Sequence, residues 1–167
     1  VILTDDQGPW ALGCAGNHEI YTPHLDRLAR TGTRFNNFFC ASPVCSPARA
    51  SLLTGLPPSR HGILDWLTLG NVDCAALGIA GDDRPVQYLE RFKGYTDILV
   101  RNGYCAGLSG KWHVGDSAKP QMGFSHWFAH TQSGGHYYTN APMIRDGIVE
   151  RQSKYLTEAI VDDTIAF

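Results

Sequence analysis

The stretch Cys45-Ser46-Pro47-Ala48-Arg49 constrains this chain more than any other part of its sequence. Pro47 suits the first turn of a helix, where its missing N–H costs nothing, and Gly55 can adopt the left-handed conformation that ends one. The spacing therefore predicts a short helix that begins near Cys45. The unpaired N–H groups and the dipole at such a start favour an anion. Arg49, four residues on, lies on the same helix face and can reach back toward Cys45.

A lone cysteine is most often a small buried hydrophobe, but this cysteine is followed by Pro47, Arg49 and the run Ala-Ser-Leu-Leu-Thr-Gly. The whole pattern closely resembles the signature of the type I sulfatases. In that family the cysteine is oxidised after translation to formylglycine, an aldehyde that hydrates to a geminal diol. The resemblance implies that one diol oxygen at position 45 is the nucleophile and that Arg49 holds it. Such a covalent change replaces the chemistry of the thiol.

Two adjacent carboxylates follow the first apolar run of the chain. Val1 to Thr4 predicts a buried strand, and Asp5 and Asp6 come directly after it. Ligands of open α/β sheets bind beyond the carboxyl ends of strands. Neighbouring carboxylates repel each other unless a cation neutralises them, and oxygen ligands suit Ca²⁺ or Mg²⁺; a solvated turn is the alternative. The sulfatase resemblance implies that Asp5, Asp6 and the residue derived from Cys45 bind the metal, usually calcium.

A second motif follows the strand predicted at 104–109. In the run Gly-Lys-Trp-His-Val-Gly, Lys111 and His113 would point the same way if the backbone is extended. A fixed cation beside an imidazole suits a sulfate dianion and a proton transfer; the alternative is an exposed lysine and a core histidine. This run also resembles a sulfatase motif. The resemblance implies that Lys111 binds the sulfate and that His113 is the partner of the diol.

Three further segments are candidates for the site or its surroundings. Ser133 and His136 lie in the glycine-rich run 132–138, and the resemblance suggests that they reach the substrate. His61, in the loop 57–62, could line the pocket, but we favour a structural role. Residues 65–85 are glycine-rich and aperiodic, which predicts a surface loop over the site.

The remaining pattern alternates helices and strands. We expect a helix capped by Thr22 and Pro23 and stopped at Gly32, a strand at 33–39 and a helix at 95–101. We also expect a hairpin at 143–149 with Asp146-Gly147 at its turn, and a helix from Ser153 with Leu156, Ala159, Ile160 and Thr164 on one face. The run 122–128 resembles the next strand of the sulfatases. This order indicates an α/β fold. The resemblance implies a three-layer, alkaline-phosphatase-like sandwich with a mostly parallel central sheet. It also implies that residues 1–167 are the N-terminal portion of a sulfatase catalytic domain, truncated at both ends.

Composition excludes several other classes. The net charge is −2 and the Lys and Arg residues are scattered, which argues against a nucleic-acid surface. No apolar run approaches the ~20 residues of a membrane span, and no signal peptide is present. The sequence has no Cys-x-x-Cys pair, which argues against a structural zinc site. Beside Cys45, the other cysteines could pair or stay free; they are Cys14, Cys40, Cys74 and Cys105.

The resemblance implies a sulfuric ester hydrolase. A diol oxygen attacks sulfur in line, the alcohol leaves, and the second hydroxyl, deprotonated by a base such as His113, collapses to the aldehyde and expels sulfate. The alternatives are a phosphonate monoester or phosphodiester hydrolase of the same superfamily and a non-catalytic sulfatase-derived binding protein. Expected partners are a small-molecule or glycan sulfate ester and a formylglycine-generating enzyme, in a periplasmic, secreted or lysosomal setting. We expect the 167 residues by themselves to be inactive.

Overall fold

The computed structural model describes residues 1–81, 83–131, 138 and 140–167. The chain divides into two compact units, Val1–Cys40 and Ala41–Phe167. Among the described residues, all five cysteines are free thiols. No helix in the described part of the chain is long and apolar enough to cross a membrane.

The first unit contains the short 3-10 helix η1 (Gly13–Ala15) and the helix α1 (Pro23–Thr31). Thr22 occupies the N-cap position and Gly32 the C-cap position of α1, as predicted. The carboxylate of Asp26 accepts hydrogen bonds from the backbone N–H of Cys14 at 2.7 Å and from the hydroxyl of Thr22 at 3.0 Å. Asp26 therefore ties η1 to α1.

The strands predicted at 1–4 and 33–39 are not formed. Residues 1–40, all of which the structure describes, contain neither a β ladder nor a buried residue. Val1 is 98% exposed and Ile2 is 87% exposed. Both predictions were wrong because an apolar run becomes a strand only where a neighbouring strand pairs its N–H and C=O groups. A unit of ~40 residues also has too little interior to bury such a run by itself.

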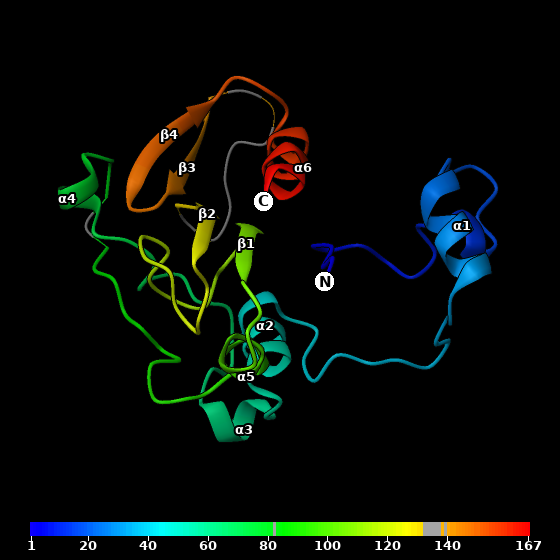
Figure 1. Cartoon of the computed structure of the whole chain (residues 1–167), viewed down its shortest axis with the longest axis horizontal. Coiled ribbons are helices and arrows are strands. Elements are labelled where there is room, and N and C mark those ends of the chain that lie inside the picture. Colours follow the sequence, from blue (N-terminus) through cyan, green and yellow to red (C-terminus); the bar gives the residue numbers. More distant parts are fainter. Residues whose placement is uncertain (82, 132–137, 139) are drawn as a thin grey trace. The chain divides into compact units, whose positions relative to one another are not determined.

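The second unit is built on a four-stranded sheet (Figure 1). Its strands are β1 (Gly107–Gly110), β2 (His126–His130), β3 (Ala141–Arg145) and β4 (Ile148–Gln152), and they lie in that order. β1 and β2 are parallel, whereas the other two pairs are antiparallel. The predicted hairpin is confirmed: Asp146 and Gly147 at its turn have φ values of 47° and 86°, as the favoured two-residue turn requires.

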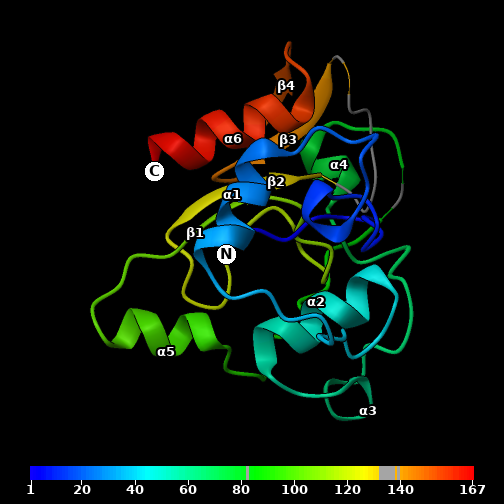
Figure 2. The same cartoon turned by 90° about the vertical axis from the view of Figure 1, so that its right-hand side faces the viewer.

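Alternation along the strands separates two faces of this sheet. On one face, Phe128 and Met143 pack against Leu156 of α6 (Leu156–Ala166). On the other face, Trp127 belongs to the cluster that contains Ala50 of α2 (Cys45–Thr54). In Figure 2, α6 and α2 accordingly lie on opposite sides of the strands. The sheet is thus the middle of three layers in this unit.

A buried carboxylate fastens α6 to the sheet. Asp163 accepts hydrogen bonds from His126 Nε2 at 2.8 Å, from Arg145 Nη1 at 2.6 Å and from the hydroxyl of Ser109. Burial raises the pKa of this carboxyl, but the hydrogen bonds from His126, Ser109 and Arg145 outweigh burial and hold the pKa below its ordinary value.

The predicted apolar face of α6 is largely confirmed. Leu156 and Ala159 are buried, and Ile160 packs beside them. Thr164 is exposed instead, and its hydroxyl donates to the carbonyl of Ile160 at 2.7 Å. Asp163 takes the buried position that the sequence pattern gave to Thr164.

Three short helices complete the second unit, and they are α3 (Pro58–His61), α4 (Cys74–Leu77) and α5 (Tyr95–Arg101). α2 contacts both α3 and α5, and α5 ends at Asn102 as predicted. The prediction of a plain surface loop at 65–85 was wrong. Val72 and Cys74 are buried against Ile144. The backbone of this segment can be buried because its polar groups have hydrogen-bond partners. For example, the Asp83 carboxylate accepts hydrogen bonds from the backbone N–H groups of the two residues before Val72.

Candidate active site

Cys45 is the first residue of α2, which begins and ends where the sequence predicts. Val44 is extended before it, with φ −124° and ψ 140°, and Gly55 ends the helix with φ +70°. The next two residues, Ser46 and Pro47, are buried, while Cys45 is half-buried. The side chain at position 45 is therefore held at a helix N-terminus, where unpaired N–H groups favour an anion.

Lys111 lies next to Cys45. Its Nζ is 3.5 Å from the Cys45 Sγ, although the two residues belong to different elements of the second unit. Lys111 follows β1 directly, so the end of that strand delivers the ammonium group to the start of α2. The Cys45 Sγ stands in for the oxygens that formylglycine would carry at this position. The role of Lys111 as a sulfate ligand remains a prediction.

Arg49 is 9% exposed, and its Nη1 donates to the backbone carbonyl of Lys111 at 2.6 Å. This bond links α2 to the segment after β1 and fixes the backbone of the residue that carries the ammonium group. Arg49 thus lies about one helical turn after Cys45 in α2 and contacts the residue whose ammonium group lies beside Cys45. Direct binding of the diol by Arg49 remains a prediction.

His113 is buried, with 2% of its surface exposed. Its Nε2 lies 3.0 Å from the carbonyl oxygen of Leu67, and the indole of Trp66 meets its ring edge-on with 5.5 Å between centroids. The backbone at His113 has φ +55°, so the segment is not extended there. The alternation argument that aimed Lys111 and His113 the same way therefore fails. A role for His113 at the diol remains a prediction.

The backbone of Leu67 is part of the site and was missed from the sequence. Its N–H donates to the Ser46 Oγ at 3.1 Å, and its carbonyl meets His113. Backbone contacts of this kind leave no signature in residue type, and Leu67 sits in a stretch without periodicity. Leu67 thus brings the segment 65–85 into contact with the residue after Cys45 and with His113, while the expectation that this segment lies over the active site stays a prediction.

The comparisons with known proteins decide the family. The sequence model of the family described as "Sulfatase" matches residues 1–167. This chain belongs to the sulfatase family.

Curated relatives cover most of the chain. A rat (Rattus norvegicus) steryl-sulfatase is 37% identical over 126 residues, which are 75% of this chain and 21% of that protein. A human (Homo sapiens) N-acetylgalactosamine-6-sulfatase is 36% identical over 133 residues, which are 77% of this chain and 24% of that protein. The sulfatase chain thus spans less than a quarter of the length of these two relatives.

Solved structures show the same fold. BT4656 in complex with its substrate D-glucosamine-2-N,6-O-disulfate has a TM-score of 0.76 and 30% identity, over 98% of this chain and 29% of that chain. Ps i-CgsB in complex with k-i-k-neocarrahexaose has a TM-score of 0.79 and 27% identity, over 98% and 39%. The sulfatase chain therefore has the alkaline-phosphatase-like α/β fold, with its described strands in a mixed sheet.

His61 has the structural role that the sequence favoured. Its Nδ1 accepts from the backbone N–H of Ile63 at 3.1 Å, and its Nε2 lies 3.0 Å from the Ser51 hydroxyl. Burial lowers the pKa of this imidazole, while a backbone hydrogen bond at Pro47 acts in the opposite direction. The imidazole of His61 thus links α2 to α3.

The other predicted site residues of the sulfatase chain stay predictions. Asp5 and Asp6 are exposed in the first unit, and Asp6 has φ +52°. Their chemistry fits the implied cation, because two adjacent carboxylates offer hard oxygen ligands. Ser133 and His136 lie outside the described residues.

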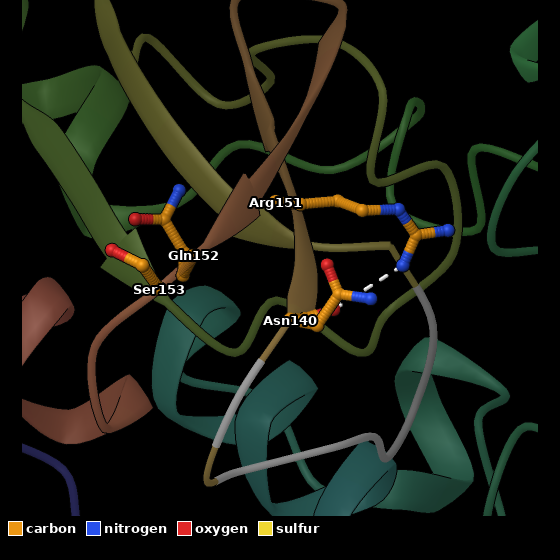
Figure 3. A pocket seen from close by; sticks show the side chains of 4 residues that line it. All are labelled: Asn140, Arg151, Gln152 and Ser153. Carbon is orange, nitrogen blue, oxygen red and sulfur yellow. Dashed lines mark hydrogen bonds between the residues drawn. The ribbon is translucent and has the colours of Figure 1, made fainter.

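An open pocket of about 340 Å³ lies at the end of the β3–β4 hairpin (Figure 3). It is lined by Asn140, Arg151, Gln152 and Ser153, and Arg151 Nη1 donates to the carbonyl of Asn140 at 3.2 Å. Gln152 and Arg151 point in different directions in this view, as neighbours on a strand do. None of the predicted site residues that the structure describes lines this pocket.

Proposed function

We propose that the protein carrying this chain is a sulfuric ester hydrolase that cleaves a sulfate monoester with formylglycine at position 45. The observation that carries the proposal is the contact of the Lys111 ammonium with the Cys45 side chain at the N-terminus of α2, 3.5 Å apart. A nucleophile precursor, a fixed cation and free N–H groups meet there, in a chain that belongs to the sulfatase family.

The chain's own residues would act mainly through charge and position. The formylglycine diol supplies an oxygen nucleophile when it is present. Lys111 would neutralise charge on the sulfuryl oxygens as the ester bond to sulfur breaks, and such fixed charges are a large part of enzymatic rate enhancement. Arg49 would keep Lys111 in place through the bond to its carbonyl and would orient the group at position 45. His113 would accept the proton of the second hydroxyl group at residue 45.

A divalent cation belongs to the proposal. Asp5, Asp6 and the oxygen at residue 45 would hold it, and their hard oxygen chemistry favours Ca²⁺, with Mg²⁺ as the second choice. When bound, such a cation acidifies a hydroxyl group and offsets negative charge. We also propose that a formylglycine-generating enzyme modifies Cys45, and that the protein acts in a periplasmic, secreted or lysosomal compartment.

The substrate class we propose is a sulfate ester of a glycan or of a small alcohol. The relatives include a steryl-sulfatase and an N-acetylgalactosamine-6-sulfatase, and BT4656 was solved with a sulfated glucosamine as its substrate. Ser133 and His136 are proposed to contact this substrate.

The test is a side-by-side rate panel. The protein carrying the chain is co-expressed with a formylglycine-generating enzyme and assayed on an aryl sulfate, on sulfated sugars, on a phosphodiester and on a phosphonate monoester. Cys45→Ala serves as the inactive control, because it cannot be converted to formylglycine. We expect kcat/KM to be highest on a sulfate ester. Higher kcat/KM on the phosphorus esters would replace the proposal by a phosphoester or phosphonate hydrolase. No turnover on any ester, together with unmodified Cys45, would indicate a non-catalytic protein.

A further inference from the structure

One residue, Leu67, joins two parts of the candidate site through its backbone N–H and C=O groups. Its N–H donates to the Ser46 Oγ at 3.1 Å and its carbonyl oxygen lies 3.0 Å from the Nε2 of His113. Ser46 is fully buried and directly follows Cys45 in α2. The helix that presents residue 45 is therefore connected to the imidazole through the backbone of a single residue, Leu67.

The neighbouring residue, Trp66, contacts the same imidazole. Its ring meets His113 in a T-shaped arrangement, with an angle of 76° between the ring planes. Trp66 is 45% exposed whereas His113 is 2% exposed, so the indole contributes to the burial of the imidazole. The backbone N–H of Trp66 is itself bonded to the Asp65 carboxylate at 2.7 Å, which helps to fix the segment.

The contact with Leu67 determines which nitrogen of His113 can act as a base. A backbone carbonyl oxygen only accepts hydrogen bonds, so Nε2 must carry the proton of this bond. A neutral imidazole has a single N–H, which leaves the lone pair on Nδ1. His113 also adopts φ +55°, a conformation that non-glycine residues keep only where the surroundings hold it.

We propose that the Trp66–Leu67 segment, anchored on Ser46, is a positioning element that holds His113 in its Nε2–H tautomer with Nδ1 as the basic atom. The inference rests on the proposed sulfate ester hydrolysis for its kinetic consequence. Its structural part, the tautomer and its dependence on Ser46 and Trp66, can be measured without any substrate.

The first arm of the test is spectroscopic. Long-range ¹H–¹⁵N spectra of the protein with labelled histidine report the tautomer of each imidazole, and His113→Gln assigns the signal of His113. We expect the Nε2–H tautomer in the wild type and a shift toward a mixture in Ser46→Ala and in Trp66→Ala. Leu64→Ala is the control, because Leu64 is 69% exposed in the same segment, and its His113 signal should not move. An Nδ1–H tautomer in the wild type, or unchanged signals in both variants, would overturn the proposal.

The second arm is kinetic, with rates divided by the aldehyde content at residue 45. At metal-bound histidines, loss of the group that orients the imidazole costs about 10–100-fold in activity. We expect kcat to fall by about that factor in Ser46→Ala and Trp66→Ala with KM nearly unchanged, and Trp66→Phe to restore most of it. A raised KM with unchanged kcat in Trp66→Ala would overturn positioning in favour of a direct substrate contact. If Trp66→Ala fails to fold, Trp66→Phe and Ser46→Ala still decide the question. A wild type inactive on all sulfate esters would remove the proposed function alone, since the tautomer remains measurable.

Discussion

Asp163→Asn is expected to destabilise the second unit by about 2–3 kcal/mol, because one hydrogen bond to a charged group is worth about 1.5–3 kcal/mol. The wild-type carboxylate accepts from three side chains on three strands, those of Ser109, His126 and Arg145. The asparagine amide keeps one acceptor oxygen. Its NH₂ group replaces the second oxygen and therefore faces a donor that has lost its acceptor. The loss stays below that of a fully buried ion pair, since the Arg145 side chain is 36% exposed and also pairs with Glu150.

The neighbouring carboxylate provides the control. Asp162 lies one residue earlier on α6, but its side chain is 58% exposed in an ion pair with Lys154. Asp162→Asn should therefore change the free energy of unfolding by less than about 1 kcal/mol. Both variants are compared by urea unfolding of the protein carrying the chain, followed by circular dichroism. Equal free energies of unfolding for Asp163→Asn and Asp162→Asn would refute the claim that Asp163 fastens α6 to the sheet.

The effect of Asp163→Asn also has a predicted pH dependence. The hydrogen bonds from His126, Ser109 and Arg145 outweigh burial, so the folded pKa of Asp163 lies below its ordinary 3.8. A carboxyl whose pKa is lowered by folding stabilises the protein above the unfolded pKa, and this stabilisation is lost as the pH falls toward the folded pKa. The difference between wild type and Asp163→Asn should hold at neutral pH and shrink below pH 3.8. A stability difference between the two proteins that grows on acidification would contradict the predicted direction of the pH dependence.

Three further predictions concern the site. Cys45→Ala should abolish hydrolysis of an aryl sulfate while the urea midpoint stays within error of wild type, since a half-buried side chain at a helix start loses little packing; full activity would refute the assignment. Lys111→Met should lower kcat by about 10²–10³-fold, the usual cost of one charge-stabilising donor, and Lys111→Arg should recover part of it; unchanged kcat in Lys111→Met would exclude Lys111 from the chemistry. Chelation of divalent cations should remove activity and Ca²⁺ should restore it, whereas metal analysis that finds tightly held zinc would contradict the ligand set Asp5 and Asp6.

The sequence predicted those parts of the fold whose causes are local. Pro47 and Gly55 set the limits of α2, and Asp146-Gly147 set the hairpin turn, because each acts through its own backbone preference. The strand predicted at 1–4 failed because pairing depends on a neighbour that local pattern does not reveal. Asp163 was missed as a buried residue, since an aspartate on a helix suggests a solvated face until its partners on three strands are known.

The candidate site divides in the same way. Cys45, Arg49 and Lys111 were predicted from side-chain motifs, and the structure brings Lys111 to Cys45 and Arg49 to the backbone of Lys111. The contact of Leu67 with Ser46 and His113 could not be predicted, because a backbone group forms it and any residue type supplies one. The left-handed backbone at His113 could not be predicted either, since only a small fraction of non-glycine residues adopt it, even though histidine does so more often than most.

The central claim is that residue 45 acts as formylglycine in sulfate ester hydrolysis, and one measurement tests it most directly. The protein carrying the chain is prepared with graded amounts of formylglycine-generating enzyme, and mass spectrometry of the peptide containing residue 45 gives the fraction in which the cysteine has become the aldehyde. The same preparations are assayed on an aryl sulfate. We predict that kcat rises in proportion to the aldehyde fraction and extrapolates to zero when Cys45 is unmodified. Turnover that is independent of this fraction would contradict the claim.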